Sequence, residues 1–154
     1  MSQRFSTAGM TLKYCVETTA GTRPTASFTE IPEVKTVPDL NPAPNGIDVT
    51  PLSETAYVQY VDGLKDVGGV LEFTANLTED LITAWSTLIS AYNTGIAADK
   101  ETWFAVVHPS LTQAVYFTGK PVPLGLSGAE VGSALETTLY IAPSNAPAMY
   151  TKPT

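Results

Sequence analysis

The sequence contains very few of the residues that metal binding and nucleophilic catalysis usually require. Its 154 residues include one cysteine, Cys15, and one histidine, His108. A single cysteine forms no intrachain disulfide, and one thiol with one imidazole does not complete a metal site. We therefore predict no metal, no cofactor and no structural disulfide, and we expect Cys15 to be a buried thiol on a strand.

The sequence also lacks a recognisable catalytic arrangement. His108 precedes a proline, and no GxSxG elbow accompanies it, so a structural histidine at a strand end is the simplest interpretation. Glu72, Glu101 and Glu136 fall on predicted strands and would suit glycoside hydrolysis if they converged in one pocket. A solvated polar sheet face explains these glutamates more simply. We predict that the protein is not an enzyme and has no catalytic residues.

Charged residues are scarce, and the basic ones are scattered. Asp, Glu, Lys and Arg make up 15% of the sequence, against about 25% in a typical globular protein, and the net charge is −7. Because tight binding to phosphates requires clustered Lys and Arg, we expect no tight binding to nucleic acid. A surface with few charges leaves area for neighbouring subunits, which favours a protein that assembles.

Long apolar runs are absent as well. No stretch of 18 consecutive apolar residues occurs, so we predict no membrane-spanning helix. The apolar content of 44% is ordinary for a globular protein, and the length fits one domain over residues 1–154.

The sequence does contain a series of short segments with strand character. Alternation is clearest at 70–77, where apolar residues face one way and Glu72, Thr74 and Asn76 face the other. Residues 103–107 are apolar on both faces and predict a central, doubly covered strand. Pro32 interrupts the segment 28–37, which predicts an edge strand or a break there. Seven strands are predicted, over residues 11–18, 28–37, 56–61, 70–77, 101–108, 114–119 and 133–142.

One segment, at about 78–94, has the pattern of an amphipathic helix. Thr78 is a suitable N-cap, two acidic residues follow it, and Asn93 and Gly95 are expected to end the helix. Its apolar stripe is broad enough to cover a sheet and consists of Leu81, Ile82, Trp85, Leu88, Ile89 and Tyr92. The predicted fold class is mostly β (α+β), a β-sandwich or barrel of about seven strands with one flanking helix.

Three segments lack regular patterns. Residues 1–10 predict a flexible N-terminal arm, and residues 143–154 predict an extended C-terminal tail. Residues 38–55 predict a long loop, followed after one short strand by a glycine-rich connection at 62–69. The long loop is either a mobile surface loop or an arm that contacts a partner through its apolar side chains.

Three short motifs together resemble the major tail tube proteins of long-tailed, non-contractile (siphovirus-type) bacteriophages. They are IDVTPLS at 47–53, YVDGLKDVG at 60–68 and VLEF at 70–73. Proteins of that family often carry a DVT-x-L stretch, then GL-x-D-x-G leading into an alternating strand, and then one helix. The order of the predicted elements is similar over the whole chain.

The resemblance implies a structural virion protein located in the phage tail and assembled in the bacterial host cytoplasm. Its subunits would form hexameric rings that stack into a hollow tube, with a continuous β-barrel around the lumen. Double-stranded DNA would pass through that lumen without tight binding. The implied partners are other copies of the chain, the tape-measure protein, the tail terminator and the tail-tip proteins.

Two groups of residues are candidates for these roles. A polar sheet face can line a wet lumen, and acidic residues there would repel phosphates so that DNA slides. The lumen candidates are Glu72, Thr74, Asn76, Glu136 and Thr138. The candidates for contacts between subunits lie in the loop 38–55, together with the N-terminal arm, and are Leu40, Ile47, Val49 and Leu52.

Two other functions are compatible with the sequence. A different phage tail ring protein, such as a terminator or a baseplate-proximal protein, would form one ring without polymerising. A monomeric carbohydrate-binding β-sandwich would also be acidic, but it would expose tryptophan. Trp85 and Trp103 both lie on predicted core faces.

Overall fold

The computed structural model describes residues 3–41, 44–65, 69–126 and 128–154. Its single α-helix in these ranges, α1, covers Glu79–Ala97. The strands in chain order are β1 Thr11–Val16, β2 Thr29–Ile31, β3 Val34–Thr36, β4 Pro44–Asp48, β5 Tyr60–Lys65, β6 Leu71–Asn76, β7 Thr102–Val107, β8 Gln113–Pro121, β9 Glu136–Pro143 and β10 Ala148–Thr151.

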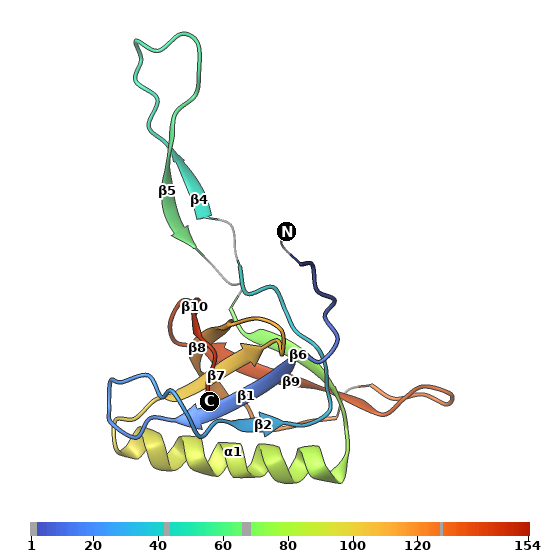
Figure 1. Cartoon of the computed structure of the whole chain (residues 1–154). Helices are drawn as coiled ribbons and strands as arrows, with labels where there is room; N and C mark the ends of the chain where they lie inside the picture. Colours follow the sequence, from blue (N-terminus) through green and yellow to red (C-terminus); the bar gives the residue numbers. More distant parts are fainter. Residues whose placement is uncertain (1–2, 42–43, 66–68, 127) are drawn as a thin grey trace.

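Seven of these strands form one curled antiparallel sheet. The order across it is β2-β1-β7-β8-β9-β6-β3, and β10 adds to β8 beside this path. The strands β4 and β5 form a separate two-stranded ribbon that projects from the body (Figure 1). The mostly β architecture with one flanking helix confirms the predicted fold class.

The connection between β2 and β3 curls the sheet. These two strands are the opposite ends of the strand order, yet the chain between them contains only Pro32 and Glu33. From Ile31 to Val34 the chain spans at most about 11 Å, so the two ends of the sheet must lie close together. The Glu33 carbonyl also accepts a hydrogen bond from the Asn76 backbone at 3.0 Å. The predicted break at Pro32 is therefore confirmed, and it produces a half-barrel.

The strand β8 links the two halves of this half-barrel. Its residues 115–118 pair with β7, whereas residues 119–121 pair with β9. At the change of partner stands Gly119, where a Cβ atom would lie 2.7 Å from Ile141 and 2.9 Å from the Ala142 carbonyl. The strand runs to Pro121, two residues beyond the predicted end at Gly119. Proline is tolerated there because the backbone N–H of the next residue, Val122, makes the hydrogen bond to β9, at the Tyr140 carbonyl, at 3.0 Å.

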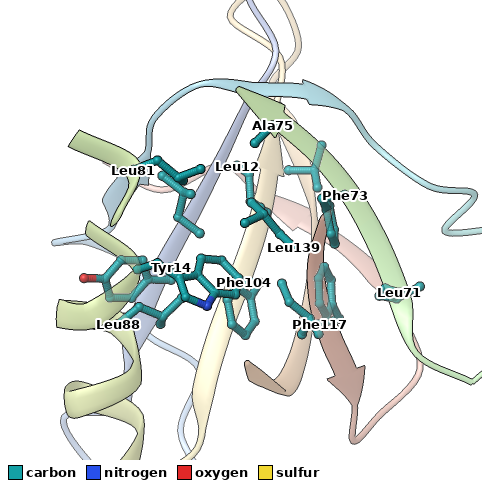
Figure 2. Close-up of a cluster of buried hydrophobic side chains, with 14 residues drawn as sticks. Leu12, Tyr14, Leu71, Phe73, Ala75, Leu81, Leu88, Phe104, Phe117 and Leu139 are labelled. Carbon is teal, nitrogen blue, oxygen red and sulfur yellow. The ribbon is translucent and has the colours of Figure 1, made fainter. Parts of the chain in front are cut away.

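The core lies between the sheet and α1 (Figure 2). Three phenylalanines from different strands stack at its centre: the Phe117 ring lies 5.4 Å from that of Phe104 and 6.4 Å from that of Phe73. The helix contributes Leu81, Trp85 and Leu88 to this core. The fourteen buried members of the core are Leu12, Tyr14, Ile31, Leu71, Phe73, Ala75, Leu81, Trp85, Leu88, Phe104, Val106, Phe117, Leu139 and Ile141.

The strand β7 is also covered on its other face, as predicted. A smaller cluster there contains Ala105, Val107, Ala114 and Tyr116. The C-terminal strand β10 helps to cover it, because the Tyr116 hydroxyl donates to the Thr151 carbonyl at 2.7 Å. Residues 148–151 of the segment that was predicted as an extended tail form a sheet strand, which raises the strand count above seven.

The helix begins where predicted but ends later. The Thr78 hydroxyl accepts a hydrogen bond from the Leu81 backbone at 3.2 Å, which is the expected N-cap. Gly95 does not end the helix, which continues to Ala97. A Cβ atom at Gly95 would lie 2.7 Å from Val16, so the glycine permits close packing against β1. No helix in the described ranges is both long and apolar enough to cross a membrane.

The prediction for residues 38–69 is partly wrong. The segment 38–55 contains β4, which pairs with β5 in an antiparallel ribbon. The strand predicted at 56–61 begins at residue 60 instead and runs to residue 65, so it includes half of the predicted connection 62–69. Residues 42–43 and 66–68 lie outside the described part of the chain. Gly63, the one glycine in the segment 60–65, caused this error, since a glycine weakens the strand pattern.

The outward face of β1 differs from its prediction. Cys15 is half-buried and not fully buried, whereas Glu17, which follows the strand, is 3% exposed. The Glu17 carboxylate accepts hydrogen bonds from the Gly21 backbone, the Glu101 backbone and the Trp103 indole at 2.9–3.1 Å. Burial raises the pKa of Glu17, but these three donors outweigh it and the net pKa is lowered. The three donors therefore stabilise the charged form of the buried Glu17 carboxylate.

Candidate assembly surfaces

The five predicted lumen residues lie together on one sheet face. Their side chains point away from the core, because the alternate residues of β6 and β9 are buried. The same face also contains Tyr140, which was not among the candidates. Tyr140 lies two residues after Thr138 on β9, so its side chain points to the same side of the sheet. The register pairs Glu72 with Tyr140, Thr74 with Thr138 and Asn76 with Glu136.

The charge of this face is less negative than the prediction assumed. Lys35, from β3, forms an ion pair with Glu136, and Lys120 is the register partner of Ala142 at the far end of β9. Glu72 is exposed and forms no ion pair within the described ranges. The Glu136–Lys35 pair is itself half-exposed and contributes about 0–1 kcal/mol. Glu72 is therefore the strongest source of negative charge on the face.

The β4–β5 ribbon and its tip, residues 44–65, form an arm that carries apolar side chains into solvent. Of the predicted contact residues, Ile47 and Val49 are about half-exposed and Leu52 is fully exposed, at 106%. Tyr57, Val58 and Tyr60 are also exposed and were not predicted. The β4–β5 arm is the long extension at the top of Figure 1.

Hydrogen bonds within the β4–β5 arm order its tip. The Glu54 carboxylate accepts from the backbone N–H groups of Ala56 at 2.9 Å and Thr55 at 3.1 Å. These backbone donors, that of Ala56 first, lower the pKa of Glu54. The Thr50 hydroxyl also accepts from the Gln59 backbone at 2.6 Å. The tip therefore has a defined shape although its apolar side chains remain uncovered.

Leu40 has a different environment from the other predicted contact residues. It is half-buried and packs against the main core of its own chain. The structure thus brings Ile47, Val49 and Leu52 together on the arm and leaves Leu40 at its base.

A second projection lies between β8 and β9, at residues 122–135 (Figure 1). It exposes Leu126, Leu135 and Val131, the last at 105%. The sequence had indicated a glycine-rich turn here, at 125–132, and no contact role. The sequence feature that could have indicated a contact role is the presence of Leu126, Val131 and Leu135 in and beside a glycine-rich segment.

A groove of about 700 Å³ runs between α1 and the start of this second projection. The Trp85 indole donates a hydrogen bond to the Val122 carbonyl at 2.8 Å, which holds the two walls together. The lining is mostly apolar and includes Leu77, Ile82, Ile89, Pro123, Leu124 and Leu126. We refer to it as the α1 groove.

The residues considered for catalysis do not converge. Glu72 and Glu136 lie on the same face but about 13 Å apart along the strands, since four residues separate their register positions. Glu101 lines a different, small pocket of about 90 Å³ beside Lys120. Within the described ranges, no group of three or more His, Cys, Asp or Glu residues could hold a metal ion.

His108 connects the N-terminal segment to the end of β7. Its Nε2 atom lies 2.7 Å from the Ser6 carbonyl, and its Nδ1 atom accepts from the Ser110 backbone at 3.1 Å. Nε2 therefore carries the proton and donates to Ser6. The side chain is 8% exposed, and its role in these contacts is structural. The described part of the predicted N-terminal arm is thus attached to the body at this point.

Comparison with known proteins identifies the fold and no family. No family model matches the sequence, and no curated protein matches it. The structure is similar to a chain in the 6-fold symmetrised cryo-EM structure of the anti-feeding prophage (AFP) baseplate. The two share a TM-score of 0.59 over 98% of this chain and 98% of that chain, with 9% sequence identity. The likeness over the full length shows that the two chains have the same fold.

Proposed function

We propose that this protein is a structural subunit of a phage tail tube. In this role it forms hexameric rings that stack into a hollow tube. The observation that carries the proposal is the full-length similarity to a chain of the AFP baseplate, a six-fold symmetrised assembly. The exposed apolar side chains on two projections support it, because large uncovered apolar patches mark sites of protein association.

In the proposed tube, the polar face of β6 and β9 lines the lumen. One face of these strands is buried in the core, so the other is free to contact water. Glu72, which forms no ion pair within the described ranges, supplies negative charge there, which disfavours phosphate binding and allows DNA to slide during ejection. The proposal implies a virion location, assembly in the bacterial cytoplasm and contacts with the tape-measure, terminator and tail-tip proteins.

Negative-stain electron microscopy over a concentration series tests the assembly. Ammonium sulfate is included in one arm of the series, since it strengthens apolar burial and so favours association through exposed apolar side chains. Tubes or stacked rings whose length grows with concentration are the expected result. A monomer under every condition, confirmed by sedimentation velocity, contradicts the proposal.

A baseplate-proximal ring protein is the second candidate, and the origin of the structurally similar chain favours it. Such a protein would form single rings that do not lengthen with concentration. The same microscopy therefore separates the two functions.

The lumen assignment has its own test. Tubes of the Glu72→Lys variant should retain double-stranded DNA at low salt and release it at high salt, whereas wild-type tubes should not retain it. Glu79→Lys, an exposed position at the start of α1, is the matched control. Equal DNA retention by both lysine variants would show that the face of Glu72 does not line the lumen.

A further inference from the structure

A small cavity lies beside Gly119, the residue at which β8 exchanges β7 for β9 as its partner. Its volume is about 90 Å³. Tyr92 and Ile96 line it from the last turns of α1, Thr102 lines it from the start of β7, and Ser144 lines it from the segment after β9. The cavity therefore lies at a junction between the helix and three strands.

The Thr102 hydroxyl is a buried polar group at this cavity. The residue is 1% exposed, and its Oγ1 atom has no hydrogen-bond partner within the described part of the chain. On β7 the side chain of Thr102 lies on the same side as that of the core residue Phe104, which is the side covered by α1. Tyr92 and Ile96 line the cavity from that side. The hydroxyl therefore points toward the cavity.

The size and polarity of the cavity suit a ligand that can both donate and accept hydrogen bonds. A threonine hydroxyl has one hydrogen to donate and two lone pairs, and its burial without a partner destabilises a fold. One water molecule requires only about 10–15 Å³ of such space. Glu101, Lys120 and Ser144 add polar groups to the lining. The Ser144 hydroxyl bonds the Thr118 hydroxyl at 2.6 Å and retains capacity for another hydrogen bond.

We propose that this cavity is a binding site for ordered water, with the Thr102 hydroxyl as the innermost group that contacts it. A water molecule there completes the hydrogen bonding of Thr102, and further water connects it to the polar rim of Glu101, Lys120 and Ser144. The bound water links the end of α1 to the point where β8 changes its partner. This inference does not depend on the proposed tail-tube function.

The oxygen-17 magnetic relaxation dispersion of water, measured on the full chain, tests the site because it counts long-lived internal water molecules. Thr102→Val removes the hydroxyl and keeps the branched shape, so the count should fall by at least one. Thr137→Val is the matched control. Thr137 is also 1% exposed, but its hydroxyl donates to the Gly125 carbonyl at 2.8 Å, so this substitution should leave the count unchanged.

Urea denaturation of the same variants supplies a second measurement, whose sign depends on the state of the hydroxyl. A Thr102 hydroxyl bonded to water stabilises the fold, so Thr102→Val should lower the folding equilibrium constant about 5-fold. Thr137→Val should lower it to a similar extent, because it also removes a satisfied hydroxyl. A buried hydroxyl without any partner would instead make Thr102→Val stabilising.

A lower water count together with a lower equilibrium constant in Thr102→Val supports the proposal. An unchanged count, or an equilibrium constant that does not fall, overturns it. If Thr102→Val does not fold, Thr102→Ser and Thr102→Ala replace it, since these two variants differ from each other only in the hydroxyl. The count should then be higher in Thr102→Ser than in Thr102→Ala, and equal counts overturn the proposal.

Discussion

The body of the molecule and its projections use apolar side chains in opposite ways. In the body, three stacked phenylalanines and their neighbours are shielded by α1, so their burial stabilises the isolated chain. On the β4–β5 arm, Leu52 and Tyr57 stand in solvent, and their burial requires a second molecule. The difference predicts that folding and the proposed assembly depend on separate residues. Substitutions in the core should therefore change the free energy of unfolding, and substitutions on the arm should change the proposed assembly.

The largest expected effect is in the centre of the body. Phe117→Ala removes the ring that stacks on Phe73 and Phe104, and it should lower the free energy of unfolding by about 3–5 kcal/mol. Urea denaturation measures this change. Val131→Ala, at a fully exposed position, is the control and should change stability by less than about 0.5 kcal/mol. Equal effects of the two substitutions would contradict the assigned core.

The buried carboxylate of Glu17 should produce the next largest effect. Glu17→Gln weakens the acceptor of three hydrogen bonds and should cost about 2 kcal/mol at neutral pH. Because the folded-state pKa is lowered, this stabilisation is present above the unfolded-state pKa of about 4.3 and is lost as the pH falls through the folded-state value.

The measurement is the difference in unfolding free energy between wild type and Glu17→Gln from pH 7 to pH 3. The difference should shrink at the acidic end of this range. Glu30→Gln, an exposed position on β2, is the control. A difference that stays constant with pH would show that the charge of Glu17 does not stabilise the fold.

Gly95 supplies a smaller and more local test of the body. In a solvent-exposed helix, glycine to alanine would stabilise by about 1 kcal/mol. Here the new Cβ would lie 2.7 Å from Val16 and 3.1 Å from the Lys100 carbonyl, so Gly95→Ala should destabilise by about 1–3 kcal/mol. Adding Val16→Ala should recover part of that loss in a thermal melt. Stabilisation by Gly95→Ala alone would contradict the close packing of α1 on β1.

Substitutions on the β4–β5 arm should have the smallest effect on folding. Their effect on the proposed assembly should be large. Leu52→Ser should leave the free energy of unfolding within about 0.5 kcal/mol of wild type. It should raise the concentration needed for assembly about 10–100-fold, since a buried leucine contributes about 1.5–3 kcal/mol. Leu111→Ser, at an exposed position between β7 and β8 and outside both projections in the sequence, is the control for pelleting assays. Unchanged assembly of Leu52→Ser would exclude the arm tip from the interface.

Local patterns were sufficient for much of the body. The alternation in residues 70–77 predicted which side of β6 is buried, and Thr78 marked the first turn of the helix, because both signals act over a few residues. The five lumen candidates were placed on one face for the same reason. Lys35, the ion-pair partner of Glu136, was missed, because it lies about a hundred positions from Glu136 in the sequence.

The regions that were predicted poorly depend on distant contacts. The pairing of β4 with β5 overrides weak local strand signals, and β10 becomes a strand because β8 offers it an edge. The burial of Glu17 is tolerated only because Trp103 and two backbone N–H groups converge on it.

The amino-acid sequence alone therefore determined the fold class, the start of the helix and which faces of β6 and β9 are buried. These properties follow from hydrophobic periodicity and helix capping, which depend on residues that are close together in the sequence. The tertiary structure decided that Pro32 and Glu33 join the two ends of one sheet and that Gly95 is a packing position. It also decided that the arm and the groove face opposite ways. Such features depend on which distant segments meet, and local sequence patterns do not encode that.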